Sequence, residues 1–136
     1  MPSHRPNDEA ATIRAFLAAP PFAVVGASTQ PAKFGGRVLA AYLRRGLRAH
    51  PVNPRETTIL GQRCYATLAD LPEAVENISI VTPPSVTLRI VEEAAAIGAR
   101  RIWLQPGAES DAAIAKARAL GLEVISGGAC VLVELA

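Results

Sequence analysis

The sequence has little cysteine and no long apolar run. Its two cysteines, Cys64 and Cys130, stand far apart, with no CxxC pair and no nearby pair of histidines. This spacing indicates neither a zinc site nor a disulfide framework, and it favours reduced thiols in a cytoplasmic protein. The amino-terminal residues lack the apolar core of a signal peptide, and no later stretch is long enough to cross a bilayer. We therefore expect a soluble chain without a membrane partner, whose residues 1–7 are flexible and place His4 on the surface.

The sequence also has little net charge and few residue patterns typical of catalytic sites. The net charge of +2 is too small for a nucleic-acid-binding protein that relies on a basic stripe. There is no Ser-His-Asp order, no carboxylate pair with an evident shared cleft and no metal-ligand spacing. His50 falls inside a predicted strand and is interpreted as a packed or half-exposed histidine, while Glu92 and Glu93 fit a solvated helix face. The sequence thus predicts no nucleic-acid partner, no metal and no catalytic residue. Most of the following arginines are expected to be solvated: Arg44, Arg45, Arg48, Arg100 and Arg101.

Half of the 136 residues are hydrophobic, which suffices for the core of one domain over 1–136. Short apolar runs alternate with amphipathic segments. Strands are predicted at 22–26, 48–52, 78–81, 101–104 and 123–126, helices at 10–19, 36–45, 85–97 and 111–120, a helical turn at 68–71 and a further edge strand at 131–135. Asn7 or Asp8 is expected to cap the first helix. The alternation predicts an α/β fold: a doubly wound, mostly parallel, Rossmann-like sheet of about five strands with helices on both faces.

Ligands of such sheets bind outside the carboxyl ends of the strands. The first strand ends at Gly26, and Ser28 and Thr29 follow it as hydroxyl donors. We expect the missing Cβ of Gly26 to let the backbone approach a diphosphate, so that a side chain there would disturb binding more than folding.

Two marks of a dinucleotide dehydrogenase are missing. The second glycine of GxGxxG is absent after Gly26, and no acid follows the second strand in the run from His50 to Arg55. An arginine in this place suits a phosphorylated ribose, as in NADP or in the 3′-phosphoadenosine of coenzyme A, although a solvated loop charge explains Arg55 equally well.

Five ordered motifs carry a family resemblance: Val24 to Ser28, Pro51 to Pro54, Val81 to Pro84, the run from Ala96 through Gly107, and Cys130. Together they resemble the small stand-alone CoA-binding proteins, which are similar to the amino-terminal CoA-binding domain of the succinyl-CoA synthetase α subunit. The resemblance covers roughly residues 20 to 132.

The resemblance implies a coenzyme A or acyl-CoA site. The diphosphate would lie on the turn Gly26, Ala27, Ser28, Thr29 and Gln30, with Lys33 or Arg55 pairing with phosphate. The adenosine end would lie between Asn53, Pro54 and Arg55 on one side and Val81, Thr82 and Pro83 on the other, and the pantetheine arm near Gln105, Gly107 and Cys130.

Some of these residues also have plain structural explanations. The Thr82 run can start a helix, and the Gln105 amide can satisfy a loop backbone. Cys130 can face the CoA thiol, but a buried structural thiol is favoured, and Cys64 is expected away from the site. One departure from the family is the Ser126 to Cys130 run, where an acidic residue or asparagine and an arginine often precede the cysteine.

Three functions remain, in this order of preference. The first is a CoA-binding module without its own catalytic centre, acting as a carrier, sensor or regulatory partner. The second is a small NADP-dependent oxidoreductase, which explains Arg55 but lacks a catalytic constellation. The third is a protein-interaction module on a nucleotide-binding fold, with a protein partner that the sequence does not identify.

Overall fold

The computed structural model describes residues 6–30 and 32–136. His4 and most of the stretch expected to be flexible lie outside this part of the chain. The main strands are β1 (Phe22–Val25), β2 (Ala49–Val52), β5 (Asn77–Ile80), β6 (Arg101–Leu104) and β7 (Glu123–Ile125). The helices are α1 (Pro6–Leu17), α2 (Phe34–Arg44), α3 (Pro84–Ala96), α4 (Asp111–Ala119) and α5 (Val131–Glu134), with a 3-10 turn η1 (Leu68–Asp70). A small hairpin consists of β3 (Thr58–Ile59) and β4 (Gln62–Arg63).

The five main strands form one parallel sheet in the order β2-β1-β5-β6-β7. The chain first moves outward from β1 to β2 and then crosses to β5 on the other side of β1, so the strand order reverses between β1 and β5. Such a reversal leaves a crevice at the carboxyl ends of the two strands. The predicted Rossmann-like fold is confirmed.

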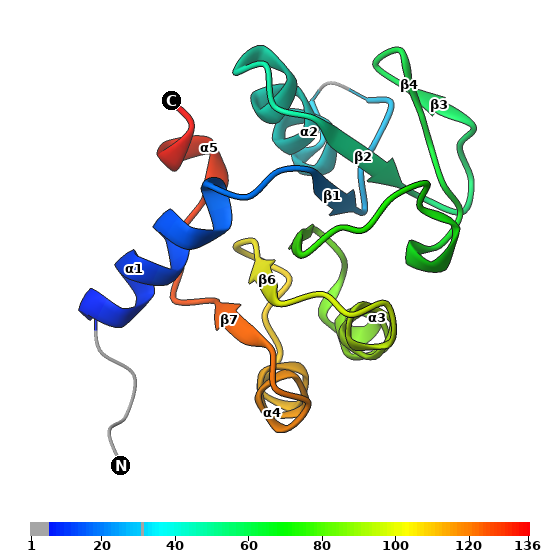
Figure 1. Ribbon diagram of the computed structural model, residues 1–136. Helices are drawn as coiled ribbons and strands as arrows, with labels where there is room; N and C mark the ends of the chain where they lie inside the picture. Colours follow the sequence, from blue (N-terminus) through cyan, green and yellow to red (C-terminus); the bar gives the residue numbers. More distant parts are fainter. Residues whose placement is uncertain (1–5, 31) are drawn as a thin grey trace.

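Two layers of helices cover the sheet (Figure 1). Buried side chains of α1, α2 and α5 form one core with the aromatic ring of Trp103. Buried side chains of α3 and α4 form the second core on the opposite face with Ile78 and Ile102. Because both faces are covered, the strands carry continuous apolar runs, as in the fully buried β1.

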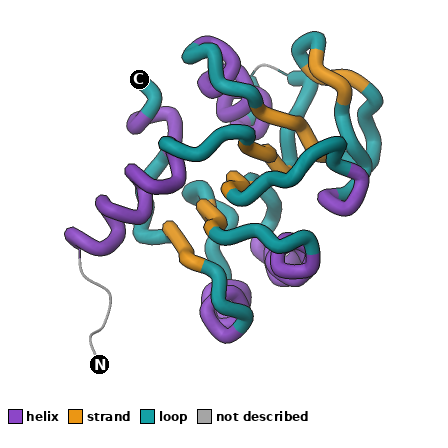
Figure 2. The backbone as a smooth tube through the Cα atoms, in the orientation of Figure 1, coloured by secondary structure: helices purple, strands orange, loops and turns teal. Residues whose placement is uncertain are grey.

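The structure differs from the sequence prediction at three places. The tail predicted as an edge strand is the helix α5, in which Val131 and Leu135 are both buried on the α2 side because the i, i+4 spacing places them on one face. The first helix is described from Pro6, so Asn7 and Asp8 lie within its bounds and not before its first residue. The hairpin β3–β4 was not predicted, and Figure 2 shows it as a separate pair of short strands beside the edge of the sheet.

Polar side chains tie the strands together at the amino-terminal end of the sheet. The Arg101 guanidinium lies 2.8 Å from the Glu123 carboxylate, on the neighbouring strand. Arg48 donates two hydrogen bonds to Glu73, and His50, half-buried as expected, bonds the same carboxylate at 2.6 Å. The Arg48 guanidinium and His50 hold the pKa of Glu73 below its ordinary value. Arg101 and Arg48 are therefore paired, not simply solvated.

Candidate functional site

A cleft of about 640 Å³ opens at the carboxyl ends of β1, β2 and β5. Its position coincides with the reversal of strand order, which is where α/β sheets of this type bind ligands. The wall contains Val25, Gly26, Ala27, Ser28, Gln30, Lys33, Val52, Asn53, Pro54, Arg55, Glu56, Ala66, Thr67, Val81, Thr82, Pro83, Val86, Arg89, Ile90 and Glu93.

The turn after β1 is held by close backbone packing. A Cβ on Gly26 would lie 2.1 Å from the Val81 carbonyl oxygen, and Gly26 has a φ of +91°. A Cβ on Gly35, in the first turn of α2, would lie 2.0 Å from the Gly26 carbonyl oxygen. These glycines therefore allow the turn to fit between β5 and α2. The expectation that a side chain at Gly26 would largely spare the fold is wrong, because the space it needs belongs to the backbone of β5's end.

Asn53 joins the two loops that flank the cleft. Its Nδ2 donates to the Ala27 carbonyl at 2.8 Å, and its Oδ1 accepts from the Arg55 amide at 2.8 Å. Both ends of the amide are thus used within the protein. Asn53 shapes the wall and fixes the start of the loop that carries Arg55.

Thr82 is also bound internally. Its hydroxyl lies 2.8 Å from the hydroxyl of Thr87, which donates to the Ala108 carbonyl at 2.8 Å. The Thr87 hydroxyl also lies 3.2 Å from the Pro83 carbonyl, so it faces two carbonyl acceptors in addition to Thr82. This relay links the start of α3 to the loop after β6. Pro84 occupies the first position of α3, so the proline run does start a helix.

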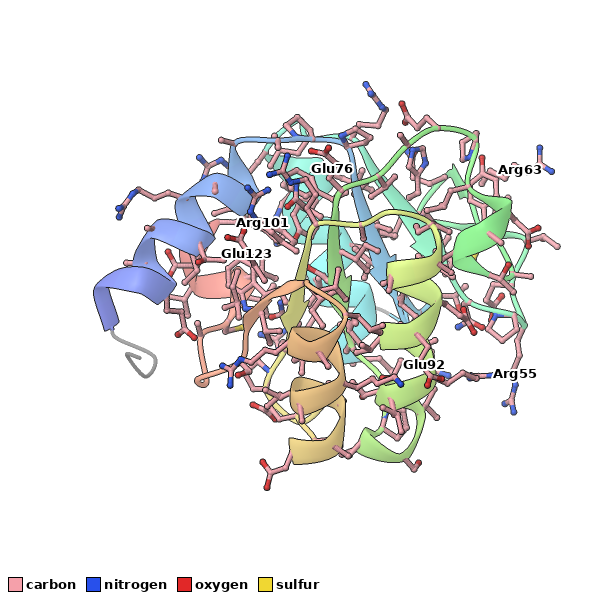
Figure 3. The ribbon with its side chains drawn as sticks, turned by 60° about the horizontal axis from the view of Figure 1, so that its bottom comes forward. Arg55, Arg63, Glu76, Glu92, Arg101 and Glu123 are labelled. Carbon is pink, nitrogen blue, oxygen red and sulfur yellow. The ribbon has the colours of Figure 1, made fainter. Side chains whose placement is uncertain are left out.

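Cationic groups stand at two sides of the cleft. Lys33 precedes α2 and Arg55 follows β2, and both side chains are exposed. Figure 3 shows Arg55 on the opposite side of the molecule from the paired Arg101 and Glu123. Among the described residues no side chain caps the amino terminus of α2, which leaves its first amide groups available near the turn.

Most of the residues suggested by the sequence line this cleft. Thr29 lines a second hollow beside α2 instead. Gln105, Gly107 and Cys130 line neither hollow. The Gly107 amide donates to Glu109 at 2.8 Å, so it is occupied within its own loop.

Gln105 is fully buried beneath the loop after β6. Its Oε1 accepts from the Val131 amide at 3.0 Å, at the first residue of α5, while its Nε2 has no hydrogen-bond partner among the described residues. The amide therefore anchors α5 to β6, as the structural alternative for this residue suggests. Cys130 directly precedes α5 and is half-buried.

Cys64 lies closer to the cleft than expected. The hairpin folds the chain back, so that Tyr65 bridges Val52 and the Cys64 thiol donates to the Asn53 carbonyl at 3.5 Å. Burial raises the pKa of the Cys64 thiol. Cys64 lines neither hollow, but its thiol contacts the Asn53 loop on the side away from the cleft wall.

Sequence reasoning missed the wall contributed by α3. Val86, Arg89, Ile90 and Glu93 follow one another at helical spacing and face the cleft. Arg89 and Glu93 form an i, i+4 ion pair at 3.9 Å. The 3.6-residue period after the Thr82 run is the signal that identifies this face. Glu56 was also missed, although it follows Arg55 directly and places a carboxylate in the wall.

Comparisons with known proteins agree with this geometry. A family model for a CoA binding domain matches residues 21–136. The chain belongs to this family of CoA-binding domains. It is 35% identical over 71 residues to an ADP-forming acetate–CoA ligase of Archaeoglobus fulgidus, an alignment that covers 52% of this chain and 10% of the ligase. The chain thus spans only a small part of the curated relative that it matches.

Two solved structures resemble the whole domain. A conserved hypothetical protein from Pyrococcus furiosus is 40% identical, with a TM-score of 0.79 over 83% of this chain and 97% of its own. A hypothetical protein from Pyrococcus horikoshii is 29% identical, with a TM-score of 0.87 over 98% of this chain and 96% of its own.

In the part of the chain that the structure describes, no group of three His, Cys, Asp or Glu residues is arranged to hold a metal ion. None of the helices described there has the length and the apolar character that a membrane-spanning helix requires.

Proposed function

We propose that this chain binds coenzyme A or a short acyl-CoA in the cleft at the carboxyl ends of β1, β2 and β5. Membership of the CoA-binding domain family carries the proposal. The position and the volume of the cleft support it, since about 640 Å³ is within the range of nucleotide-sized ligand sites.

The charges and shapes in the wall suit the parts of the ligand. The turn from Gly26 to Gln30 and the uncapped start of α2 offer amide donors to the diphosphate. Arg55 is free to pair with the 3′-phosphate, because its backbone, not its guanidinium, is held by Asn53. The exposed rings of Pro54 and Pro83 offer flat apolar surfaces to the adenine.

The pantetheine arm would leave the cleft toward Gln105, Gly107 and Cys130. These residues follow β6 and β7, at the same edge of the sheet. Cys130 is the more accessible of the two thiols, because Cys64 is only 7% exposed. If CoA disulfide is offered, the Cys130 thiolate attacks one sulfur, a protein–CoA mixed disulfide forms and one CoA thiolate leaves. Peptide mass mapping should locate the adduct at Cys130, and an adduct only at Cys64 would contradict this part of the proposal.

We further propose that the chain acts as a carrier, sensor or regulatory partner without a catalytic centre of its own. The activity of the archaeal ligase belongs to a protein of which the aligned segment is 10%. The cleft wall offers hydrogen-bonded threonine and asparagine side chains and an Arg89–Glu93 pair, with no nucleophile held by a base. Formation of an acyl-CoA from acid, CoA and ATP by the purified chain, with loss of that activity on a change in the cleft, would overturn this.

Calorimetry with four ligands tests the binding proposal. We expect CoA to bind more tightly than NADP and NAD. Arg55→Ala should lose on the order of 1 to 3 kcal/mol of CoA binding free energy, with a smaller loss for dephospho-CoA, since only CoA carries the 3′-phosphate. Arg118→Ala, which removes an exposed arginine of α4, is the matched control. Binding of NADP as tight as that of CoA would favour the oxidoreductase alternative instead.

A further inference from the structure

A second hollow of about 550 Å³ runs along the exposed side of α2. We call it the α2 groove, and it is bounded by Arg37, Ala40 and Arg44 of α2, Leu60 of the hairpin, and Leu132 and Leu135 at α5. Small alanines of α2 form its floor and leucines form its other side. It is separate from the cleft, but Ser28 lines both hollows.

The groove carries three arginines, Arg37, Arg44 and Arg45, and Ala136, the last residue of the sequence, also lines it. Arg37 and Arg44 are exposed and form no ion pair with any carboxylate in the described part of the chain. Arg45 donates to the Leu135 carbonyl at 2.8 Å, which fastens α5 to α2 but leaves the positive charge unpaired. Arginine beside apolar surface is a combination enriched at protein interfaces.

Leu60 supplies an independent observation. It is the first residue of the two-residue turn Leu60-Gly61 between β3 and β4, and both residues have positive φ angles, of 51° and 77°. Asn, Asp or Gly normally fills such a position, because a leucine side chain crowds the backbone there. Yet this leucine is 49% exposed and lines the groove. The turn therefore holds an exposed apolar side chain in an unfavourable backbone conformation. A contact between this side chain and a binding partner would explain why leucine occupies the position.

We propose that the α2 groove docks an acidic amphipathic segment of a second protein. Apolar side chains of that segment enter between Leu60, Leu132 and the alanine floor, while its carboxylates pair with Arg37 and Arg44. The two arginines are seven residues apart on α2, two turns along the same face, so they match acidic residues at helical spacing on the partner. This role is additional to ligand binding, and it places the partner against the Ser28 turn that borders the cleft.

Charge complementarity selects this occupant over a second copy of the chain. A two-fold contact through the groove would bring the arginines of one copy toward those of the other, which like-charge repulsion opposes. The alanine and leucine walls would in turn contribute little to the binding of a small hydrophilic anion. An acidic segment with apolar residues satisfies both the charge and the apolar surface.

The test is peptide selection on the intact chain. Random peptides of roughly 15 residues, long enough to span α2 as a helix, are displayed and selected on the unaltered chain at about 0.1 M salt. Leu60→Asn suits the turn, so it should keep or raise thermal stability while it removes the apolar contact. We expect the selected peptides to combine Asp or Glu with Leu, Ile, Phe or Met.

Variants locate the binding of the selected peptides. Leu60→Asn and Arg44→Glu should each weaken it at least about tenfold, and exchange of the peptide's acidic residues for lysine should restore binding to Arg44→Glu. Leu120→Asn and Arg118→Glu, exposed residues of the α4 region, are the matched controls and should bind like the unaltered chain.

Several results would overturn the proposal. These are the absence of enriched peptides, enrichment without acidic residues, binding indifferent to Leu60→Asn, or displacement of the peptides by CoA, which would place them in the cleft. A dimer of the chain alone in sedimentation that Leu60→Asn dissociates would also overturn it, because the groove would then be a self-interface. Failure of CoA binding, measured separately, leaves the docking test unaffected.

Discussion

The glycines of two turns at the carboxyl edge of the sheet differ in what they touch. Where the turn after β1 packs against β5 and α2, Cβ atoms on Gly26 of the turn and on Gly35 and Gly36 of α2 would meet backbone oxygens at 2.1, 2.0 and 2.7 Å. In the turn after β7, a Cβ on Gly127 would approach only the Glu9 side chain, at 3.1 Å, and one on Gly128 would meet nothing within 4 Å, although the φ of Gly128 is +89°. The first turn needs glycine for space, and the second needs it for conformation. The difference indicates that the first turn is a rigid part of the scaffold, while the second can accept change.

The strongest test of this comparison is Gly35→Ala. The added Cβ would overlap the Gly26 carbonyl, which is backbone and has no alternative rotamer, so α2 must move away from β1. We expect a loss of about 3 kcal/mol or more in the free energy of unfolding. Urea denaturation followed by circular dichroism measures it. A loss no larger than that of Gly128→Ala would contradict the distinction between the two turns.

A smaller effect is expected at the residue that ties the first turn to its neighbour. Asn53→Ala removes the bond to the Ala27 carbonyl and the bond from the Arg55 amide, so it should cost about 2 kcal/mol of stability. CoA binding should weaken as well, since the Arg55 loop loses its anchor. Asn53→Asp is the informative control: it keeps the acceptor for Arg55 but lacks the donor to Ala27. Unchanged stability in both variants would show that the two loops hold their positions independently.

The sequence predicted the main elements of the fold because their signals are local. Apolar strands end at turn residues, and amphipathic helices follow them at a regular period. The strand predicted at 101–104, for example, has the same bounds as β6 in the structure. The prediction of a strand at 131–135 was wrong because five residues with four apolar side chains fit a strand as well as a helical turn. Only the contacts with α2 and Gln105 select the helix.

Prediction of the site succeeded where residues directly follow a strand. The residues after β1, β2 and β5 meet at one cleft because parallel strands share a carboxyl edge. The same rule does not distinguish the central strands from the edge strand β7, so it could not show that Cys130 stands outside the cleft wall. The contact of Cys64 with Asn53 could not be predicted, because the hairpin that brings them together contains a positive φ at Leu60, which the residue type does not signal.

Gly128→Ala tests the second of the two turns compared above, the turn after β7. The added Cβ has open space around it, so the only cost is the positive φ, about 1 kcal/mol in the free energy of unfolding. The same denaturation series that includes Gly35→Ala provides the measurement. A loss of the size expected at Gly35 would mean that the turn after β7 is packed as tightly as the turn after β1.

The smallest effect is expected at the opposite, amino-terminal end of the sheet, where Glu73, in the loop before β5, bonds Arg48 and His50. The pKa of Glu73 lies below its ordinary value of 4.5, chiefly because Arg48 donates to it and then because His50 does. A carboxyl group whose pKa is lower in the folded state stabilises the fold fully above its unfolded pKa, and this contribution is lost as the pH falls through the folded pKa.

Glu73→Gln should therefore reduce the fall in unfolding free energy between roughly pH 5 and pH 3, with little change in CoA affinity because the cleft lies at the other edge. The change should be small, since the Arg48 side chain is 61% exposed and solvent screens the pair. Denaturation curves at a series of pH values measure the slope, with Glu76→Gln, an exposed neighbour, as the matched control. Parallel pH profiles for the unaltered chain and Glu73→Gln would show that the bonds from Arg48 and His50 to Glu73 add no stability.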